Sequence, residues 1–181
     1  MANIDSKSFA YDEMMVHIPL CSHKDINKVL VVGDVSEDFK IELKKHNVDT
    51  IFSDELNIEG QFDIILYNKN TPDELEMASI ERCLEPTKGI LVTCATSIRR
   101  DLEKAKEELA LIGKNFWICM PYSFGHTTLI FASKKYHPQA EIVLQTSDLL
   151  EDCNYYSTEM QNATFVHPTY ITKAITGIAK R

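Results

Sequence analysis

Three apolar runs that lack alternation constrain the fold of this chain more than any other feature of its sequence. They are KVLVVG at 28–33, DIILY at 63–67 and GILVTCA at 89–95. A strand with one face in water alternates apolar and polar residues, whereas a strand covered by helices on both faces is apolar throughout. The runs therefore predict central strands of a sheet that has helices on both sides.

The intervals between these runs carry the pattern of helices with one apolar face. In 97–113 the apolar residues recur at spacings of four and three, and Ser97 and Gly113 are expected to cap the two ends. A second helix is expected over 71–84, with Thr71 as its N-cap. Strands that alternate with helices predict an open, mainly parallel α/β sheet.

Two further apolar runs, at 115–122 and 127–135, are separated by only four residues. This connection is too short for a helical crossover, so the last two strands are expected to pair antiparallel. A chain of 181 residues has room for one sizeable core. We therefore expect a single domain, with a lead-in segment at 1–24 and a C-terminal extension at 136–181.

The net charge indicates which classes of ligand the protein can bind, and the cysteines indicate its cellular compartment. The net charge of −8 argues against nucleic acid, which requires a basic face, and is compatible with cationic ligands such as polyamines. We find no signal-peptide pattern and no apolar run of membrane-spanning length. The five cysteines are scattered and never form a C-x-x-C pair, so a reduced, cytoplasmic protein is expected.

Three short motifs flank the predicted strands. The run YDEMMVHIPLCSH at 11–23 is amphipathic and resembles the segment Y-[HQ]-E-M-L-x-H-x-P-L-x-x-H of the polyamine aminopropyltransferases, of which spermidine synthase is the type. Pro121, Tyr122 and Gly125 echo P-T-Y-x-x-G, and 155–168 echoes Y-Y-N-x-x-x-H-x-A-A-F-x-x-P. The residues that match the first motif are Tyr11, Glu13, Met14, His17, Pro19, Leu20 and His23.

The resemblance implies a Rossmann-like, methyltransferase-type open sheet of about six strands. It also implies decarboxylated S-adenosylmethionine, or a related nucleoside, as the donor and a polyamine as the acceptor. Two parts of the family pattern are missing: an N-terminal β-rich domain, and the helix, strand and acidic adenine-contacting loop that would follow TIFSDEL at 50–56. Only NIEGQ at 57–61 separates that stretch from the next apolar run.

The catalytic carboxylates of the family are replaced in this chain. In the family, D-[SCA]-[ST]-D-P follows the strand that corresponds to DIILY, and here the stretch is NKNTP at 68–72. Asn68 stands at the general-base position and Thr71 at the second aspartate. An amide cannot take the proton from an alkylamine with a pKa of about 10. No catalytic residue is therefore expected to be intact.

Other residues could still contact a substrate, although weakly. The family's glycine-rich turn is replaced by GDVSED at 33–38, where Asp34 or Ser36 is expected to cap a helix. The acidic residue that ends the second strand and would bind ribose hydroxyls could be Asp54 or Glu55. The expected substrate-binding residues are Asp12, Asp34, Ser36, Asp54, Glu55 and Tyr122.

A metal site is not expected. His17, Cys21 and His23 lie close together in the sequence, but neither a fourth ligand nor an acidic second shell is evident. The family motif already accounts for both histidines.

Three functional hypotheses follow. The first is a shortened, spermidine-synthase-like protein with degraded or lost aminopropyl transfer. The second is a sensor or partner subunit that binds a polyamine or nucleoside thioether. The third is an active aminopropyltransferase or methyltransferase with a relocated base, for which Asp73 is the nearest candidate. A homodimer, through a sheet edge or the apolar C-terminal segment, is compatible with each.

Overall fold

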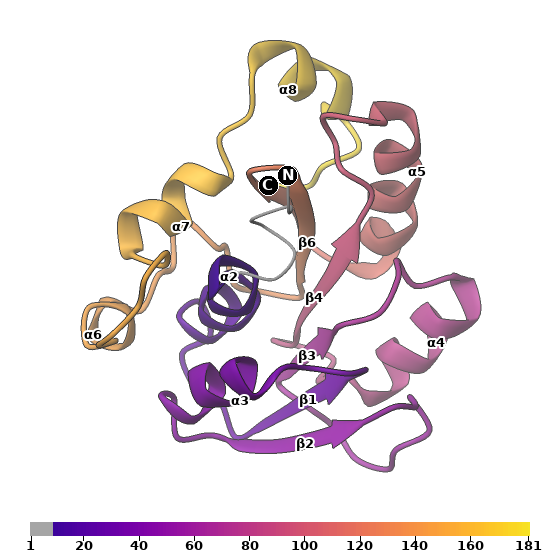
Figure 1. Cartoon of the computed structure of the whole chain (residues 1–181). Coiled ribbons are helices and arrows are strands. Elements are labelled where there is room, and N and C mark those ends of the chain that lie inside the picture. Colours follow the sequence, from indigo (N-terminus) through magenta and orange to yellow (C-terminus); the bar gives the residue numbers. More distant parts are fainter. Residues whose placement is uncertain (1–8) are drawn as a thin grey trace.

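The computed structural model of the protein describes residues 9–181 and contains one six-stranded sheet in the order β2-β1-β3-β4-β6-β5 (Figure 1). β1, β2, β3 and β4 pair in parallel, whereas β4–β6 and β6–β5 pair antiparallel. The expected open α/β sheet with a C-terminal antiparallel hairpin is confirmed. The strands are β1 Lys28–Val32, β2 Asp49–Ser53, β3 Ile64–Tyr67, β4 Ile90–Ala95, β5 Ile118–Phe124 and β6 Thr127–Ser133.

Helices cover both faces of this sheet (Figure 1). Successive residues of a strand point to opposite faces. Accordingly, Val29 and Val31 of β1 pack in a cluster with α2 and α3, whereas Leu30 and Val32 pack in a second cluster with α4, α5 and α8. The helices are α2 Phe9–Leu20, α3 Glu37–Lys44, α4 Glu74–Cys83, α5 Leu102–Ile112, α6 Leu144–Ser147, α7 Thr158–Thr164 and α8 Thr169–Ile175, with a 3₁₀ turn at Gly113–Asn115. Over the described residues, no helix has the length and apolarity needed to cross a membrane.

The helix α2 is buried on nearly all sides. Nine of its twelve residues are buried, including the charged Glu13 and the polar His17. One side packs on the sheet, and the other packs under the C-terminal segment through Tyr156 and Phe165. The prediction that this stretch is amphipathic was therefore wrong, because the C-terminal segment covers the side that would otherwise face water.

Two helices begin later than expected. α4 begins after Asp73, whose carboxylate accepts hydrogen bonds from the N–H groups of Leu75 and Glu76 at 2.9 and 2.8 Å, while Glu76 bonds back to the Asp73 N–H. Thr71 is thus not the N-cap, because the Asp73 carboxylate accepts the free N–H groups of the first helical turn. A carboxylate also interacts favourably with the positive end of the helix dipole.

The helix α5 is capped by Asp101, which accepts from the Lys104 N–H, and not by Ser97. The Ser97 carbonyl instead accepts from Arg100 and Asp101 in a separate turn. At its other end Gly113 is the C-cap, as predicted.

The outer edge of β5 is covered by the C-terminal extension. Cys119 and Lys180 exchange both of their backbone hydrogen bonds at 2.9 Å. The Pro121 carbonyl accepts from Nε2 of His167 at 3.0 Å, and a proline has no N–H of its own to offer. The tail therefore satisfies the polar groups that an edge strand would otherwise expose.

Candidate functional site

The carboxyl ends of β1, β2, β3 and β4 lie together at one edge of the sheet, where ligands of open α/β folds bind. The turn after β1 begins at Gly33, and Asn68 follows β3. Gly33 has a φ of +99°, and a Cβ atom there would lie 2.6 Å from the Asn68 carbonyl oxygen. Only glycine fits both requirements, so this residue lets the two strand ends approach each other.

The side chain of Asn68 is held at both ends of its amide. Its Oδ1 accepts a hydrogen bond of 2.5 Å from the Tyr11 hydroxyl, and its Nδ2 donates to the Asp34 carbonyl. The amide thus connects α2 to the turn after β1 across the end of β3. It uses one acceptor and one donor, which a carboxylate could not reproduce.

The Tyr11 hydroxyl that bonds to Asn68 also contacts Cys94. The Tyr11 hydroxyl lies 2.9 Å from the Cys94 sulfur. Burial, followed by the neighbouring Cys94, raises the pKa of the Tyr11 phenol, and burial likewise raises the pKa of the Cys94 thiol. Both groups are therefore neutral at pH 7 and act as hydrogen-bonding groups.

Asp12 and Ser36, two of the predicted substrate contacts, bond to each other. The Ser36 hydroxyl donates to the Asp12 carboxylate at 2.8 Å and also accepts from the Phe39 N–H as the N-cap of α3. Of the two expected caps, Ser36 is therefore the one used. Burial raises the pKa of Asp12, and the Ser36 hydrogen bond opposes that shift.

Two cavities lie at the ends of β1 and β2. One, of about 420 Å³, is lined by Asp34 and Asp54 together with Lys40. The second, of about 450 Å³, is lined by Asp54 and Glu55 on one side and by Tyr67 and Lys69 on the other. The Lys69 ammonium donates to the Asp54 carbonyl and so places a positive charge at the wall of the second cavity. Asp34, Asp54 and Glu55 therefore share one region of the surface.

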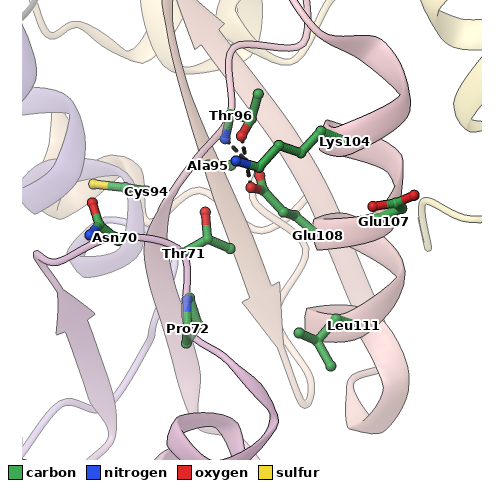
Figure 2. A pocket seen from close by; sticks show the side chains of 10 residues that line it. All are labelled: Asn70, Thr71, Pro72, Cys94, Ala95, Thr96, Lys104, Glu107, Glu108 and Leu111. Atoms are coloured by element: carbon green, nitrogen blue, oxygen red, sulfur yellow. Dashed lines mark hydrogen bonds between the residues drawn. The ribbon is translucent and has the colours of Figure 1, made fainter.

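A third cavity, of about 720 Å³, lies between the loop after β3 and the helix α5 (Figure 2). Thr71 lines it from the loop, and Cys94 lines it from β4. On the opposite wall Glu108 accepts from the Thr96 N–H and hydroxyl at 2.6 and 2.7 Å (Figure 2). The Glu108 carboxylate is thus fully engaged in fixing the end of β4.

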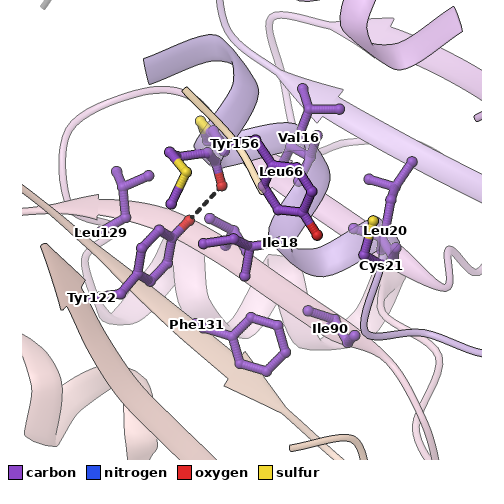
Figure 3. Packing of buried hydrophobic residues seen from close by; sticks show 14 of the residues in the cluster. Val16, Ile18, Leu20, Cys21, Leu66, Ile90, Tyr122, Leu129, Phe131 and Tyr156 are labelled. Carbon is purple, nitrogen blue, oxygen red and sulfur yellow. Dashed lines mark hydrogen bonds between the residues drawn. The ribbon is translucent and has the colours of Figure 1, made fainter. Parts of the chain in front are cut away.

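Tyr122 does not reach any of these cavities. Its ring is completely buried in the core beside Leu129, and its hydroxyl donates to the Met14 carbonyl at 3.2 Å (Figure 3). Burial raises its pKa well above the usual value of 10.0. The structure therefore places this predicted substrate contact in the packing between α2 and β5.

The three residues considered for a metal do not share a site. The His23 ring packs on Tyr136, and Cys21 is buried in the core. His17 instead lies beside Glu42 of α3 and Cys153 of the loop after α6. Sequence analysis missed this group because the three residues are far apart along the chain. The His17 motif was its only signal.

Comparisons with known proteins find sequence similarity to the polyamine aminopropyltransferases. A family model described as the spermine/spermidine synthase domain matches residues 8–60. The polyamine aminopropyltransferase of Clostridium beijerinckii is 24% identical in an alignment that covers 96% of this chain and 80% of the relative. That of Helicobacter acinonychis is 22% identical, with 86% and 72% covered.

Solved structures share the fold. The spermidine synthase from Thermotoga maritima superimposes with a TM-score of 0.80 at 19% identity, covering 93% of this chain and 74% of the other. A spermidine synthase in complex with the transition-state analogue AdoDATO superimposes with a TM-score of 0.79, also at 19% identity. The chain thus shares its overall fold with these two spermidine synthase structures.

Proposed function

As this chain belongs to the polyamine aminopropyltransferase family, we propose that it keeps the family scaffold but has lost efficient aminopropyl transfer. In that reaction an amine nitrogen attacks a methylene carbon beside a sulfonium. The amine has a pKa of about 10, so at neutral pH nearly all of it is protonated and cannot attack. A carboxylate must take the proton, and its position in this chain is held by Asn68.

The observation that carries the proposal is the two-sided hydrogen bonding of Asn68. Its amide nitrogen donates to the Asp34 carbonyl while its oxygen accepts from Tyr11. The surroundings are therefore matched to an amide, and an aspartate there would direct an oxygen at the Asp34 carbonyl. This argues that the neighbours of Asn68 are arranged to bind an asparagine and not the aspartate of the family.

The relocated base considered in the third hypothesis has less support. The Asp73 carboxylate is occupied by the N–H groups of Leu75 and Glu76 at the start of α4. Both hydrogen bonds are accepted by its Oδ1, and they fix the Asp73 side chain in a structural role as the helix cap. We therefore rank the hypothesis of active transfer with Asp73 as the base below the hypothesis that transfer has been lost.

The direct test is an assay of the purified chain with decarboxylated S-adenosylmethionine and putrescine. We expect no transfer at rates typical of enzymes, and a bacterial spermidine synthase assayed in parallel serves as the positive control. Turnover above about one per second would contradict the proposal. In that case Asp12→Asn and Asp73→Asn would show which carboxylate replaces the missing base.

A second candidate function is the binding of a nucleoside thioether or polyamine without catalysis. It is favoured by the two cavities at the ends of β1 and β2, whose walls contain Asp34, Asp54 and Glu55. Carboxylates in a cleft attract cationic ligands. The test is a thermal-shift titration with methylthioadenosine, S-adenosylmethionine and spermidine, in which a ligand present at 100 times its Kd should stabilise by about 2.7 kcal/mol. Absence of any stabilisation at millimolar ligand would exclude this function.

We also propose that the protein is cytoplasmic and forms a homodimer. The wide exposure of Trp117, which stands next to β5, and of Phe52 on β2 supports a self-contact. Sedimentation equilibrium of the purified chain measures the mass directly, and a single species of about 20.7 kDa at all concentrations would contradict the dimer.

A further inference from the structure

We propose that His17, Glu42 and Cys153 form a binding site for a transition-metal ion of the zinc class. They come from three elements: the last turn of α2, the last turn of α3 and the loop after α6. One nitrogen, one carboxylate oxygen and one sulfur lie within 4.8 Å of one another. The site does not depend on the proposed function, because it uses none of the groups around Asn68.

The donor set and its spacing suit zinc. Zinc binds histidine nitrogen, carboxylate oxygen and thiolate sulfur at roughly 2.0–2.3 Å, which separates neighbouring donors by roughly 3.3–3.7 Å in a tetrahedral site. The Cys153 sulfur is 3.6 Å from Nε2 of His17, within that range. The Glu42 oxygen is 2.8 Å from the same nitrogen, so it must move outward by about half an ångström from its present hydrogen-bonding distance.

The loop that carries Cys153 is fixed in place by a buried carboxylate. Glu13, one helical turn before His17, is fully buried and accepts the N–H groups of 154–156 at 2.8, 2.8 and 2.7 Å. Three charge-assisted hydrogen bonds to consecutive residues anchor the loop to the same helix that presents His17. The thiol is therefore positioned beside the imidazole by the fold.

A second-shell partner is also present. Nδ1 of His17 lies 2.8 Å from Nε2 of His46. Histidines that bind metals typically donate their other ring N–H to a carboxylate, a backbone carbonyl or water, and here the imidazole of His46 takes that place. In the metal-bound state His17 carries its proton on Nδ1 and donates it to His46, which leaves the Nε2 lone pair for the ion. The Cys153 thiol releases its proton to solvent as the sulfur–metal bond forms.

Lys45 gives the proposal its sharpest test. Its ammonium nitrogen lies 2.8 Å from the Glu42 oxygen and 3.9 Å from the Cys153 sulfur. The ammonium thus provides the positive charge that the ion would provide, and its long, partly exposed side chain can swing into water. Because ammonium and ion compete for the same carboxylate, removing the ammonium should strengthen metal binding.

The experiment is a zinc titration of the full chain against a chromophoric chelator, together with the absorption spectrum of the cobalt-substituted protein. We expect one ion per chain and a thiolate-to-cobalt charge-transfer band. Cys153→Ser and Glu42→Gln should each weaken zinc binding about tenfold or more, since even second-shell changes cost that much. Cys94→Ser, at the other partly buried thiol, and Glu37→Gln, on the same helix, are the matched controls and should change nothing.

Lys45→Met should tighten zinc binding several-fold, whereas Lys40→Met on the same helix should not. Three outcomes overturn the site: no zinc binding at micromolar concentration, a cobalt spectrum without the thiolate band, or zinc binding unaffected by Glu42→Gln. Circular dichroism establishes that each variant is folded. If Cys153→Ser does not fold, the opposite effects of Glu42→Gln and Lys45→Met still decide the question.

Discussion

Asn68 differs from an aspartate by a single group, and that group faces a carbonyl. We predict that Asn68→Asp destabilises the protein by about 1–3 kcal/mol at pH 7, because a carboxylate oxygen replaces the donor to the Asp34 carbonyl. The loss should shrink at acidic pH, where the new carboxyl is protonated and can donate. Urea unfolding at pH 7 and pH 4 measures both effects.

The matched control is Asn70→Asp, which introduces the same charge at an exposed position two residues further along the loop. It should change stability little at either pH. If Asn68→Asp were as stable as the unaltered protein at pH 7, the amide would not be needed by its surroundings. The main support for the proposed function would then be removed.

His23 is the residue for which the acid response can be worked out. Its ring is 3% exposed, and burial lowers its pKa from 6.5 to about 4. The unfolded chain therefore binds the proton more tightly than the folded one. The stability contributed by neutral His23 is fully present above pH 6.5 and is lost as the pH falls through 4, by up to about 3 kcal/mol.

The corresponding variant is His23→Asn, whose side-chain oxygen can accept the Asp25 N–H that now bonds to Nδ1 of His23. The acid-side slope of unfolding free energy between pH 6.5 and 4 should flatten in this variant. The same slope should be unchanged in the control variant His126→Asn, which alters an exposed histidine of the β5–β6 turn. Equal slopes in all three proteins would contradict the assignment.

At the scale of the elements, the sequence predicted strands better than helix starts. The unbroken runs around Val31, Leu66 and Leu91 were sufficient, because a strand apolar on both faces can only be central. The helix caps were harder, because 71–73 and 97–101 each contain more than one residue able to cap. Which one does so depends on the backbone conformation of the preceding turn, and local sequence does not fix that.

The cap of α5 can be tested with a matched pair of substitutions. Asp101→Ala should lower stability by about 1 kcal/mol, since it removes the acceptor for the Lys104 N–H. Ser97→Ala should cost nothing, because the Ser97 hydroxyl is buried and has no hydrogen-bond partner among residues 9–181. Urea midpoints of the two variants compare them directly, and a larger loss for Ser97→Ala would restore the cap that the sequence suggested.

At the scale of the whole molecule, the N-terminal helix and the C-terminal extension are joined by a carboxylate. Glu13 contributes its three hydrogen bonds only if the loop at 154–156 is in place. We predict that Glu13→Gln lowers stability by about 2–3 kcal/mol, because an amide oxygen accepts less strongly and its NH₂ group faces N–H donors.

Limited proteolysis should locate the effect, with cleavage near residues 150–157 accelerated in Glu13→Gln. Glu151→Gln, at an exposed position of the same segment, is the control and should be cleaved like the unaltered protein. Equal cleavage in both variants would show that the loop is held by other contacts.

The candidate site could be predicted only in part. The acidic residues Asp34, Asp54 and Glu55 line cavities at the ends of β1 and β2, because the carboxyl ends of parallel strands meet at one edge, and their role in binding stays a prediction. Tyr122 was placed in a substrate pocket by its motif, whereas the structure buries it against Met14. The contact between His17 and Cys153 spans 136 positions of sequence, and only the folded chain reveals it.

The covered margin of β5 has a consequence for how copies of this protein can associate. Lys180 and His167 already occupy the outward groups of Cys119 and Pro121. Within residues 9–181, this leaves β2 as the sheet margin open to backbone pairing. Two molecules that joined there about a twofold axis would each use up that margin. Edge-to-edge pairing of sheets through β2 would therefore stop at a dimer and could not extend into fibres.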